Sequence, residues 1–282
     1  MPDWFDETDA EDLVIRFAVE GEVARARTAF QDLVIFDSPR FGRVLALDGI
    51  VQLTEADECV YHEMIAQVPL LAHGGARRVL VIGGGDGGTI REVLKHPVER
   101  VVMVELDRGV VEACREHMPS LSAGAFDDPR LELRFEDGVD FVAKSEERFD
   151  VVIIDSTDPL PGPGEVLFGE PFYRDCKRVL APDGILISQF GMPFLYPEIV
   201  RDARRRLALC FEDATFYIVA VPVFAGGYMA FGWASDSRGL REQPVETLAS
   251  RLALSGIETR FYTPAFHRAA FALPRPIAEL LE

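Results

Sequence analysis

One segment constrains the fold most, because a strand, a glycine-rich loop, a helix and a second strand follow one another in it without a gap. Residues 79–82 form a short apolar run rich in β-branched side chains, which is typical of a buried strand. The glycine-rich loop 83–88 follows at once, and Pro97 ends the helix that is predicted after the loop. A second apolar run ends at Glu105. This order predicts parallel strands joined by a helix.

The loop contains Gly83, Gly85 and Gly88 at the spacing G-x-G-x-x-G. Small residues let the backbone approach a ligand closely, and the first N–H groups of the following helix point towards that ligand. Glu105 lies roughly twenty residues further on, where a carboxylate can accept both hydroxyls of a ribose. The alternative is a turn made only for packing, but the surrounding strand, helix and acid favour a site for an adenosine-type ligand.

Asp86 is unusual within such a loop. A carboxylate at this place repels phosphate and carboxylate groups and attracts cations. An Asp that only hydrogen-bonds its own turn is the other interpretation, and the position alone does not separate the two.

The formal net charge of the chain is -18, which argues against nucleic acid or an anionic membrane as a partner. The charge favours a cationic ligand weakly, since solubility alone also explains it. The first residues are acidic and no long apolar run exists, so we expect neither a signal peptide nor a transmembrane helix, and a cytoplasmic protein. No metal site is predicted, because the four cysteines are far apart and no His stands at ligand spacing: Cys59, Cys114, Cys176 and Cys210.

The rest of the chain divides into two predicted domains. Period-two alternation over 13–53 predicts a small antiparallel β-domain, and the helix that follows it completes a domain of residues 1–74. Residues 75–282 form the second predicted domain, in which strand and helix signals alternate and predict an α/β fold with a Rossmann-type, mostly parallel sheet. The tail of this domain, from about residue 243, has two weak helical stretches and no motif. Two late strands, 215–221 and 228–233, are joined by so few residues that they must pair antiparallel. By analogy of fold, this C-terminal hairpin is typical of methyltransferase-like proteins.

Further carboxylates follow the later strands. Asp137 and Gly138 come after one strand, where an Asp can accept the exocyclic amine of adenine or serve as a simple turn residue. Asp155 ends another strand and is followed by Asp158 and a loop rich in proline and glycine, which we expect to be a lid. Asp86, Asp155 and Asp158 should converge with few basic residues nearby.

Such a cluster is costly unless a cation fills it, although a ring of acids on a solvated rim is the alternative. A primary amine fits, because it would bind as a cation and lose its proton to a carboxylate when it attacks.

Several motifs together resemble the polyamine aminopropyltransferases, the spermidine synthase family, from about residue 28 to residue 235. They are QDLVIF, ALDG, TEADE, YHEM, VLVIGGGDGG, the strand end Glu105-Leu106-Asp107, EDG at 136–138 and DSTDP at 155–159. The resemblance implies a β-hairpin domain on a methyltransferase-like sheet, assembled as a homodimer or homotetramer. It also implies transfer of an aminopropyl group from decarboxylated S-adenosylmethionine, a co-substrate, to a small cationic amine, with release of methylthioadenosine and without a metal or cofactor.

The resemblance also implies roles for single residues. Asp155 would be the catalytic base, and Asp86 would hold the aminopropyl amine of the donor. The other donor-binding residues would be Gln31, Gly83, Gly85, Glu105, Asp137, Gly138 and Pro163. The acceptor channel would be lined by Tyr61, His62, Asp86, Asp155, Asp158 and Phe224.

Two departures from the family pattern concern the acceptor. The family has I-P-T-Y where this chain has Val221-Pro222-Val223-Phe224, so two hydroxyls are missing and Phe224 cannot hydrogen-bond an amine. The loop 160–164 also carries what looks like one extra residue. Putrescine is the acceptor by family default, while a more apolar channel favours cadaverine, agmatine or a longer polyamine.

Two other functions compete with aminopropyl transfer. A methyltransferase that uses intact S-adenosylmethionine is disfavoured by Asp86, which would face the carboxylate of that cofactor. A polyamine or nucleoside sensor without turnover is disfavoured because both Asp86 and Asp155 are present.

Overall fold

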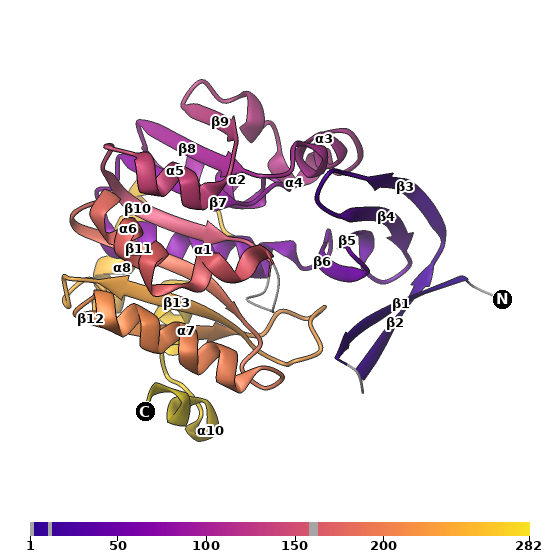
Figure 1. The fold of residues 1–282 in the computed structure, drawn as a ribbon. Helices are drawn as coiled ribbons and strands as arrows, with labels where there is room; N and C mark the ends of the chain where they lie inside the picture. The colour runs from indigo at the N-terminus through magenta and orange to yellow at the C-terminus, as the bar shows by residue number, and fades with distance from the viewer. Residues whose placement is uncertain (1–2, 11–12, 158–162) are drawn as a thin grey trace.

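The computed structural model describes residues 3–10, 13–157 and 163–282. Figure 1 shows two parts: the first six strands, in indigo, lie beside a larger body in which helices cover both faces of a sheet. The predicted α/β fold with a small N-terminal antiparallel β-domain is confirmed.

The N-terminal part consists of two antiparallel sheets. The alternating pattern from residue 13 onwards predicted most of it, but the acidic first residues also form a strand. In this strand Glu7 turns inward: it is 5% exposed, and its Oε1 accepts a hydrogen bond from the backbone N of Val51 at 3.3 Å. One sheet pairs β1 (Asp3–Ala10) with β2 (Leu13–Val19), and the other contains β3 (Gly21–Arg27), β4 (Asp32–Ser38), β5 (Gly42–Leu47) and β6 (Ile50–Thr54).

The large sheet has seven strands in the order β12-β13-β11-β10-β7-β8-β9. The strands from β11 to β9 are parallel, and β13 is antiparallel to both of its neighbours, as the short connection predicted. The bounds are β7 (Arg78–Gly83), β8 (Arg100–Glu105), β9 (Leu131–Phe135), β10 (Phe149–Asp155), β11 (Leu180–Gly191), β12 (Asp213–Val219) and β13 (Met229–Ser235).

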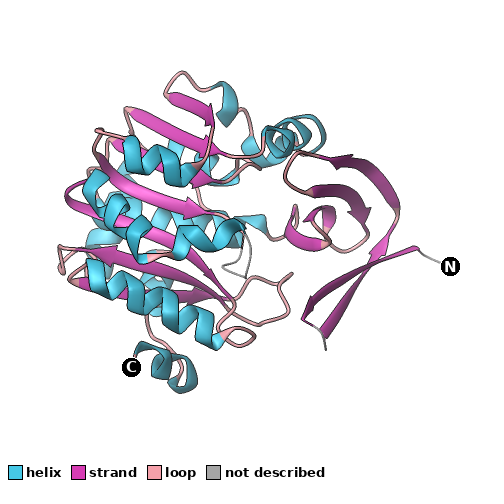
Figure 2. Ribbon diagram, in the orientation of Figure 1, coloured by secondary structure: helices cyan, strands magenta, loops and turns pink. Residues whose placement is uncertain are grey.

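Both faces of the sheet are buried, which explains the continuous apolar runs of its strands. Along β7, Val79 and Val81 belong to the core on one face, whereas Leu80 and Ile82 belong to the core on the other face. Figure 2 shows the helices in cyan on the two sides. The main helices are α1 (Glu58–His73), α2 (Gly88–Leu94), α3 (Arg108–His117), α5 (Gly138–Lys144), α6 (Glu170–Val179) and α7 (Pro197–Cys210).

Helix α1 packs mainly on the large sheet, against β10, β11 and β12. Its buried residues Met64, Ile65 and Val68 share a core with Val79 of β7. The helix ends at the left-handed Gly74. The boundary at residue 74 stays a prediction, but the packing of α1 makes this helix part of the layer that covers the parallel sheet.

The chain after residue 243 adds a further helical layer. The two weak helical stretches of the sequence correspond to α8 (Val245–Ser255) and α9 (Pro264–Ala270). Arg251 of α8 donates to the carbonyl oxygens of Leu71 and Ala72 at 2.6 and 2.7 Å, so this layer is attached to the end of α1.

Candidate active site

Several of the predicted site residues lie at the carboxyl edge of the parallel strands. The register places Asp155, the last residue of β10, beside Gly83, the last residue of β7. Glu105 pairs in the same way with Phe135 on the neighbouring strands. The ends of four strands thus form one edge, where ligands bind in open α/β folds.

Two glycines let the loop approach its neighbours closely. Gly83 has φ +83°, and a Cβ there would collide with the backbone oxygen of Asp155. A Cβ on Gly88 would collide with the imidazole ring of His62. The loop therefore packs closely against β10 on one side and against α1 on the other. The predicted Gly85 lies near Glu105, since Oε2 of Glu105 is 3.0 Å from the position of a Cβ on Gly85.

Asp86 bonds its own turn and also contacts a basic side chain of the protein. Its predicted contact with a cationic ligand stays a prediction. Its Oδ1 accepts a hydrogen bond from the backbone N of Gly88 at 2.7 Å, which is the turn bond, and lies 3.1 Å from Nε2 of His62, which is a cation. The side chains of Asp86 and His62 are 14% and 2% exposed. The expectation that few basic groups lie near the acids is wrong at this position, because the histidine comes from α1, 24 residues earlier in the chain.

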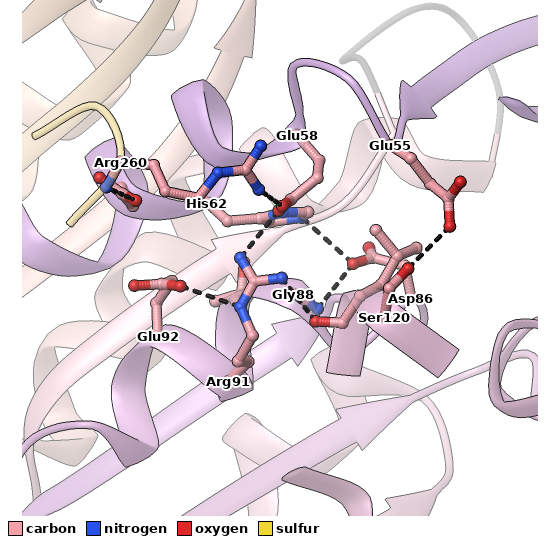
Figure 3. Close-up of polar contacts among 12 residues, drawn as sticks. Glu55, Glu58, His62, Asp86, Gly88, Arg91, Glu92, Ser120 and Arg260 are labelled. Carbon is pink, nitrogen blue, oxygen red and sulfur yellow. Dashed lines mark hydrogen bonds and ion pairs between the residues drawn. The ribbon is translucent and has the colours of Figure 1, made fainter. Parts of the chain in front are cut away.

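His62 is held between two carboxylates (Figure 3). Its Nδ1 lies 2.7 Å from Oε2 of Glu58, which also accepts from Nη2 of Arg91 at 2.8 Å. Burial lowers the pKa of His62, but the charges and hydrogen bonds of Asp86 and Glu58 raise it by more, to about 10. Burial raises the pKa of Asp86, but the His62 imidazolium outweighs it, so the pKa of Asp86 falls below its ordinary value. Asp86 is therefore a carboxylate at neutral pH.

Asp155 has a different environment. Its Oδ1 accepts from the hydroxyl of Tyr61 at 2.7 Å, and its Oδ2 accepts from Oγ1 of Thr89 at 2.6 Å. Burial raises the pKa of Asp155, and the nearby charge of Asp86 raises it further. Tyr61 was among the predicted residues, whereas Thr89 was not. The signal for Thr89 was a hydroxyl at the start of the helix that follows the glycine loop.

Glu105 lies at the expected donor side of the edge. Its Oε1 accepts from the backbone N of Asp107 at 2.8 Å, and burial raises its pKa to about 7. Gln31 reaches this region from the N-terminal sheets, because its Nε2 donates to Oδ2 of Asp107 at 2.9 Å. Oγ1 of Thr28 donates to the same oxygen at 2.6 Å. From the sequence, Asp107 was predicted only as part of a motif. An Asp immediately before a helix is a typical N-cap, and Asp107 does cap α3.

Asp137 is exposed and caps α5. Its Oδ1 accepts from the backbone N of Val139 at 2.7 Å and of Asp140 at 3.3 Å, so the interpretation as a turn residue has geometric support. The predicted contact with adenine stays a prediction. A Cβ on Gly138 would lie about 2.5 Å from Cγ2 of Ile82, so this glycine packs against β7.

The acceptor residues are placed only in part. Phe224 is half-buried and packs against the core that contains α1, and the neighbouring Val223 donates its backbone N to Oδ2 of the buried Asp57 at 2.7 Å. Asp158 and most of the loop 160–164 lie outside the described residues, and so does the predicted lid. Pro163 begins the short helix η2 (Pro163–Phe168).

Within the parts of the chain that the structure describes, no group of three or more His, Cys, Asp or Glu residues could hold a metal ion. No helix of the described chain is long and apolar enough to cross a membrane. A pocket of about 460 Å³ borders the His62 network, and its walls include Glu58, Arg91 and Arg260.

A Rossmann-type sheet whose carboxyl edge carries Glu105 and two aspartates in contrasting environments is the arrangement expected of a nucleoside-dependent transferase. Comparison with known proteins specifies the family. Residues 58–243 match the family model of the spermine/spermidine synthase domain, and residues 3–55 match that of the spermidine synthase tetramerisation domain. The chain belongs to the spermine/spermidine synthase family and is an aminopropyltransferase.

Similar proteins agree with this assignment. The chain is 55% identical to polyamine aminopropyltransferase 1 of Pseudomonas aeruginosa, over 94% of this chain and 93% of that protein. It is 50% identical to a polyamine aminopropyltransferase of Escherichia coli, over 94% of this chain and 92% of that protein. The spermidine synthase of Thermotoga maritima superimposes with a TM-score of 0.92 at 34% identity, over 100% and 96%. A spermidine synthase in complex with the transition state analogue AdoDATO superimposes with a TM-score of 0.93 at 36% identity, with the same coverage of both chains.

Proposed function

We propose that this enzyme transfers the aminopropyl group of decarboxylated S-adenosylmethionine to a diamine or polyamine and releases methylthioadenosine. The observation that carries the proposal is the ionised Asp86 in the glycine loop. Its charge favours a donor whose tail ends in an amine and disfavours one whose tail ends in a carboxylate. The solved relative that contains AdoDATO supports the same type of donor.

In the proposed reaction, the nitrogen of the acceptor attacks the methylene carbon next to the sulfonium of the donor. The new N–C bond forms as the C–S bond breaks, and the electron pair of that bond stays on sulfur as methylthioadenosine leaves. Asp155 accepts the proton that the acceptor nitrogen loses. The sulfonium is already a good leaving group, so the enzyme chiefly aligns the two molecules.

The environment of Asp155 suits a proton acceptor. Tyr61 and Thr89 each donate to one of its oxygens, which fixes the orientation of the carboxylate. Burial and the charge of Asp86 raise its pKa, which makes the carboxylate a better base than that of an ordinary Asp. Glu105 would accept the ribose hydroxyls, and the other predicted donor residues would line the adenosine pocket.

The choice of acceptor is the open part of the proposal. Putrescine is the family default, but Phe224 offers no hydroxyl to an amine. We expect cadaverine, agmatine or a longer polyamine to be used better than putrescine. We also propose a homodimer or homotetramer, which the match of residues 3–55 to a tetramerisation domain supports, and a cytoplasmic location, which the four unpaired cysteines support.

The test is release of methylthioadenosine from decarboxylated S-adenosylmethionine with a panel of diamines and polyamines, with the products identified by mass. Release with one preferred amine establishes the reaction and names the acceptor. Release with putrescine well above all other amines would refute the argument from Phe224. Donor binding without release for any amine would favour the sensor, and methyl transfer from intact S-adenosylmethionine would favour the methyltransferase.

A further inference from the structure

The segment 260–262 lies beyond the part of the chain that matches either family model. Three consecutive backbone N–H groups of this segment donate to the carboxylate of Glu63 on α1. Arg260 donates to Oε1 at 2.6 Å, and Phe261 and Tyr262 donate to Oε2 at 2.9 and 2.7 Å. Glu63 is 1% exposed. Such multiple, buried, charge-assisted bonds hold the segment firmly against α1.

The side chain of Arg260 is thereby directed along α1 towards Glu58. Its Nη1 donates to Oε1 of Glu58 at 3.0 Å. The other oxygen, Oε2, receives Nη2 of Arg91 and contacts Nδ1 of His62. Both oxygens of this buried carboxylate are therefore occupied, and Glu58 has one orientation in which it meets all three partners (Figure 3).

The orientation of Glu58 fixes the ring of His62. With Nδ1 on Glu58, Nε2 faces Oδ1 of Asp86. A histidine whose second nitrogen is held by a carboxylate keeps its ring orientation and its proton, as in the outer shells of metal sites. A chain of contacts thus runs from the C-terminal segment to the glycine loop: Arg260, Glu58, His62 and Asp86.

We propose that Arg260 is a positioning residue, which acts through Glu58 and His62 to hold Asp86 in the orientation that receives the amine of the donor. The proposal rests on the function proposed above for Asp86. It gives the C-terminal segment a role in donor binding, although that segment contains none of the residues that would contact the donor.

The test is Arg260→Gln, measured by steady-state kinetics with the donor and the acceptor varied separately. The side chain of Arg260 is 61% exposed, so the variant should fold, and the effect should be modest. We expect the KM for the donor to rise by about two- to fivefold with kcat and the KM for the acceptor unchanged, and Arg260→Lys to recover part of the loss. A matched control is Arg275→Gln, whose side chain is 93% exposed and pairs only with Glu279 in the described contacts.

A double-mutant cycle with Glu58→Gln tests whether Arg260 acts through Glu58. Glu58→Gln alone should raise the KM for the donor by about 10- to 100-fold, the range for such outer residues. In that background, Arg260→Gln should add nothing. Three results would overturn the proposal. The effect of Arg260→Gln could persist undiminished in the Glu58→Gln background, or it could appear in the KM for the acceptor. It could also equal the effect of Arg275→Gln.

Two measurements separate this proposal from the proposed function. NMR of the imidazole nitrogens reports the protonation of His62 without any substrate. We expect His62 to be an imidazolium in the wild type and to lose its proton at a lower pH in Glu58→Gln. Binding of methylthioadenosine, which has no aminopropyl amine, should be unchanged in both variants. If the wild type transfers no aminopropyl group, the proposed function fails; if His62 is unchanged in Glu58→Gln, the positioning role fails.

Discussion

The glycine loop after β7 and the end of β10 each present one aspartate to the same edge of the sheet, and the two carboxylates have opposite surroundings. Asp86 contacts an imidazolium, which lowers its pKa. Asp155 contacts two neutral hydroxyls, and its pKa is raised by burial and by the charge of Asp86. The difference suggests a division of roles. A permanently charged group suits the binding of a cation, and a group with a raised pKa suits the acceptance of a proton.

Asp155→Asn should have the largest effect, because it removes the proposed base and leaves the shape of the site. We expect kcat to fall by about 10²- to 10⁴-fold while the affinity for methylthioadenosine changes little. The measurement is methylthioadenosine release at saturating substrates. Asp202→Asn, a substitution on the exposed side of α7 at 54% exposure, is the control. Activity of Asp155→Asn within a few-fold of the wild type would remove Asp155 from the mechanism.

Asp86→Asn should affect binding of the donor more than the reaction. A contact between an amine cation and a carboxylate contributes about 1.5–3 kcal/mol, so we expect the KM for the donor to rise by about 10- to 150-fold. The loss should be specific for the decarboxylated donor, because the variant no longer repels a carboxylate. Equal weakening of methylthioadenosine binding would instead indicate that Asp86 only maintains the fold of the loop.

Glu105 gives a pH-dependent test at the ribose end of the same edge. Burial raises its pKa to about 7, so the carboxylate that would accept the two ribose hydroxyls is present above that pH and is lost below it. Affinity for methylthioadenosine should therefore increase by about tenfold from about pH 6 to about pH 8, as the ionised fraction rises from roughly a tenth to nine-tenths. Methylthioadenosine lacks the amine that Asp86 would bind, so Asp86 should not contribute. In Glu105→Gln the affinity should be independent of pH, and a flat profile in the wild type would refute the assignment.

Tyr61→Phe and Thr89→Val should have the smallest effects, and they sharpen the contrast between the two aspartates. Each removes one neutral donor from Asp155, worth about 0.5–1.5 kcal/mol, so kcat/KM should fall by about two- to tenfold. Both donors lower the pKa of Asp155. Its pKa should rise without them, and the acidic limb of the pH profile should move to higher pH. A limb that stays in place would show that Asp155 is not the group that titrates.

Local patterns predicted the sheet and the positions of its acids well. The strand, loop and helix of the nucleotide unit follow from neighbouring residues, and the period-two and period-3.6 patterns require no knowledge of contacts. The antiparallel pairing of β12 and β13 followed from the length of one connection. The strand β1 was missed because Phe5 is followed at the next inward position by Glu7, a residue that a hydrophobic pattern does not count.

The contacts between the acids and their partners could not be predicted in this way. The approach of His62 to Asp86 depends on how α1 packs over the glycine loop, and no spacing in the sequence encodes it. The resemblance to the family suggested His62 for the acceptor channel, whereas the structure shows it buried against the residue proposed to bind the donor. Its contact with an acceptor stays a prediction.

The most direct test of the account compares the binding of decarboxylated and intact S-adenosylmethionine to the wild-type enzyme by calorimetry. The two ligands differ by one carboxylate, which would face Asp86 in the glycine loop. Juxtaposed like charges cost several kcal/mol, so the account predicts that the decarboxylated form binds at least about 100-fold more tightly. Equal affinity, or tighter binding of the intact form, would contradict the role of Asp86 and favour a methyltransferase.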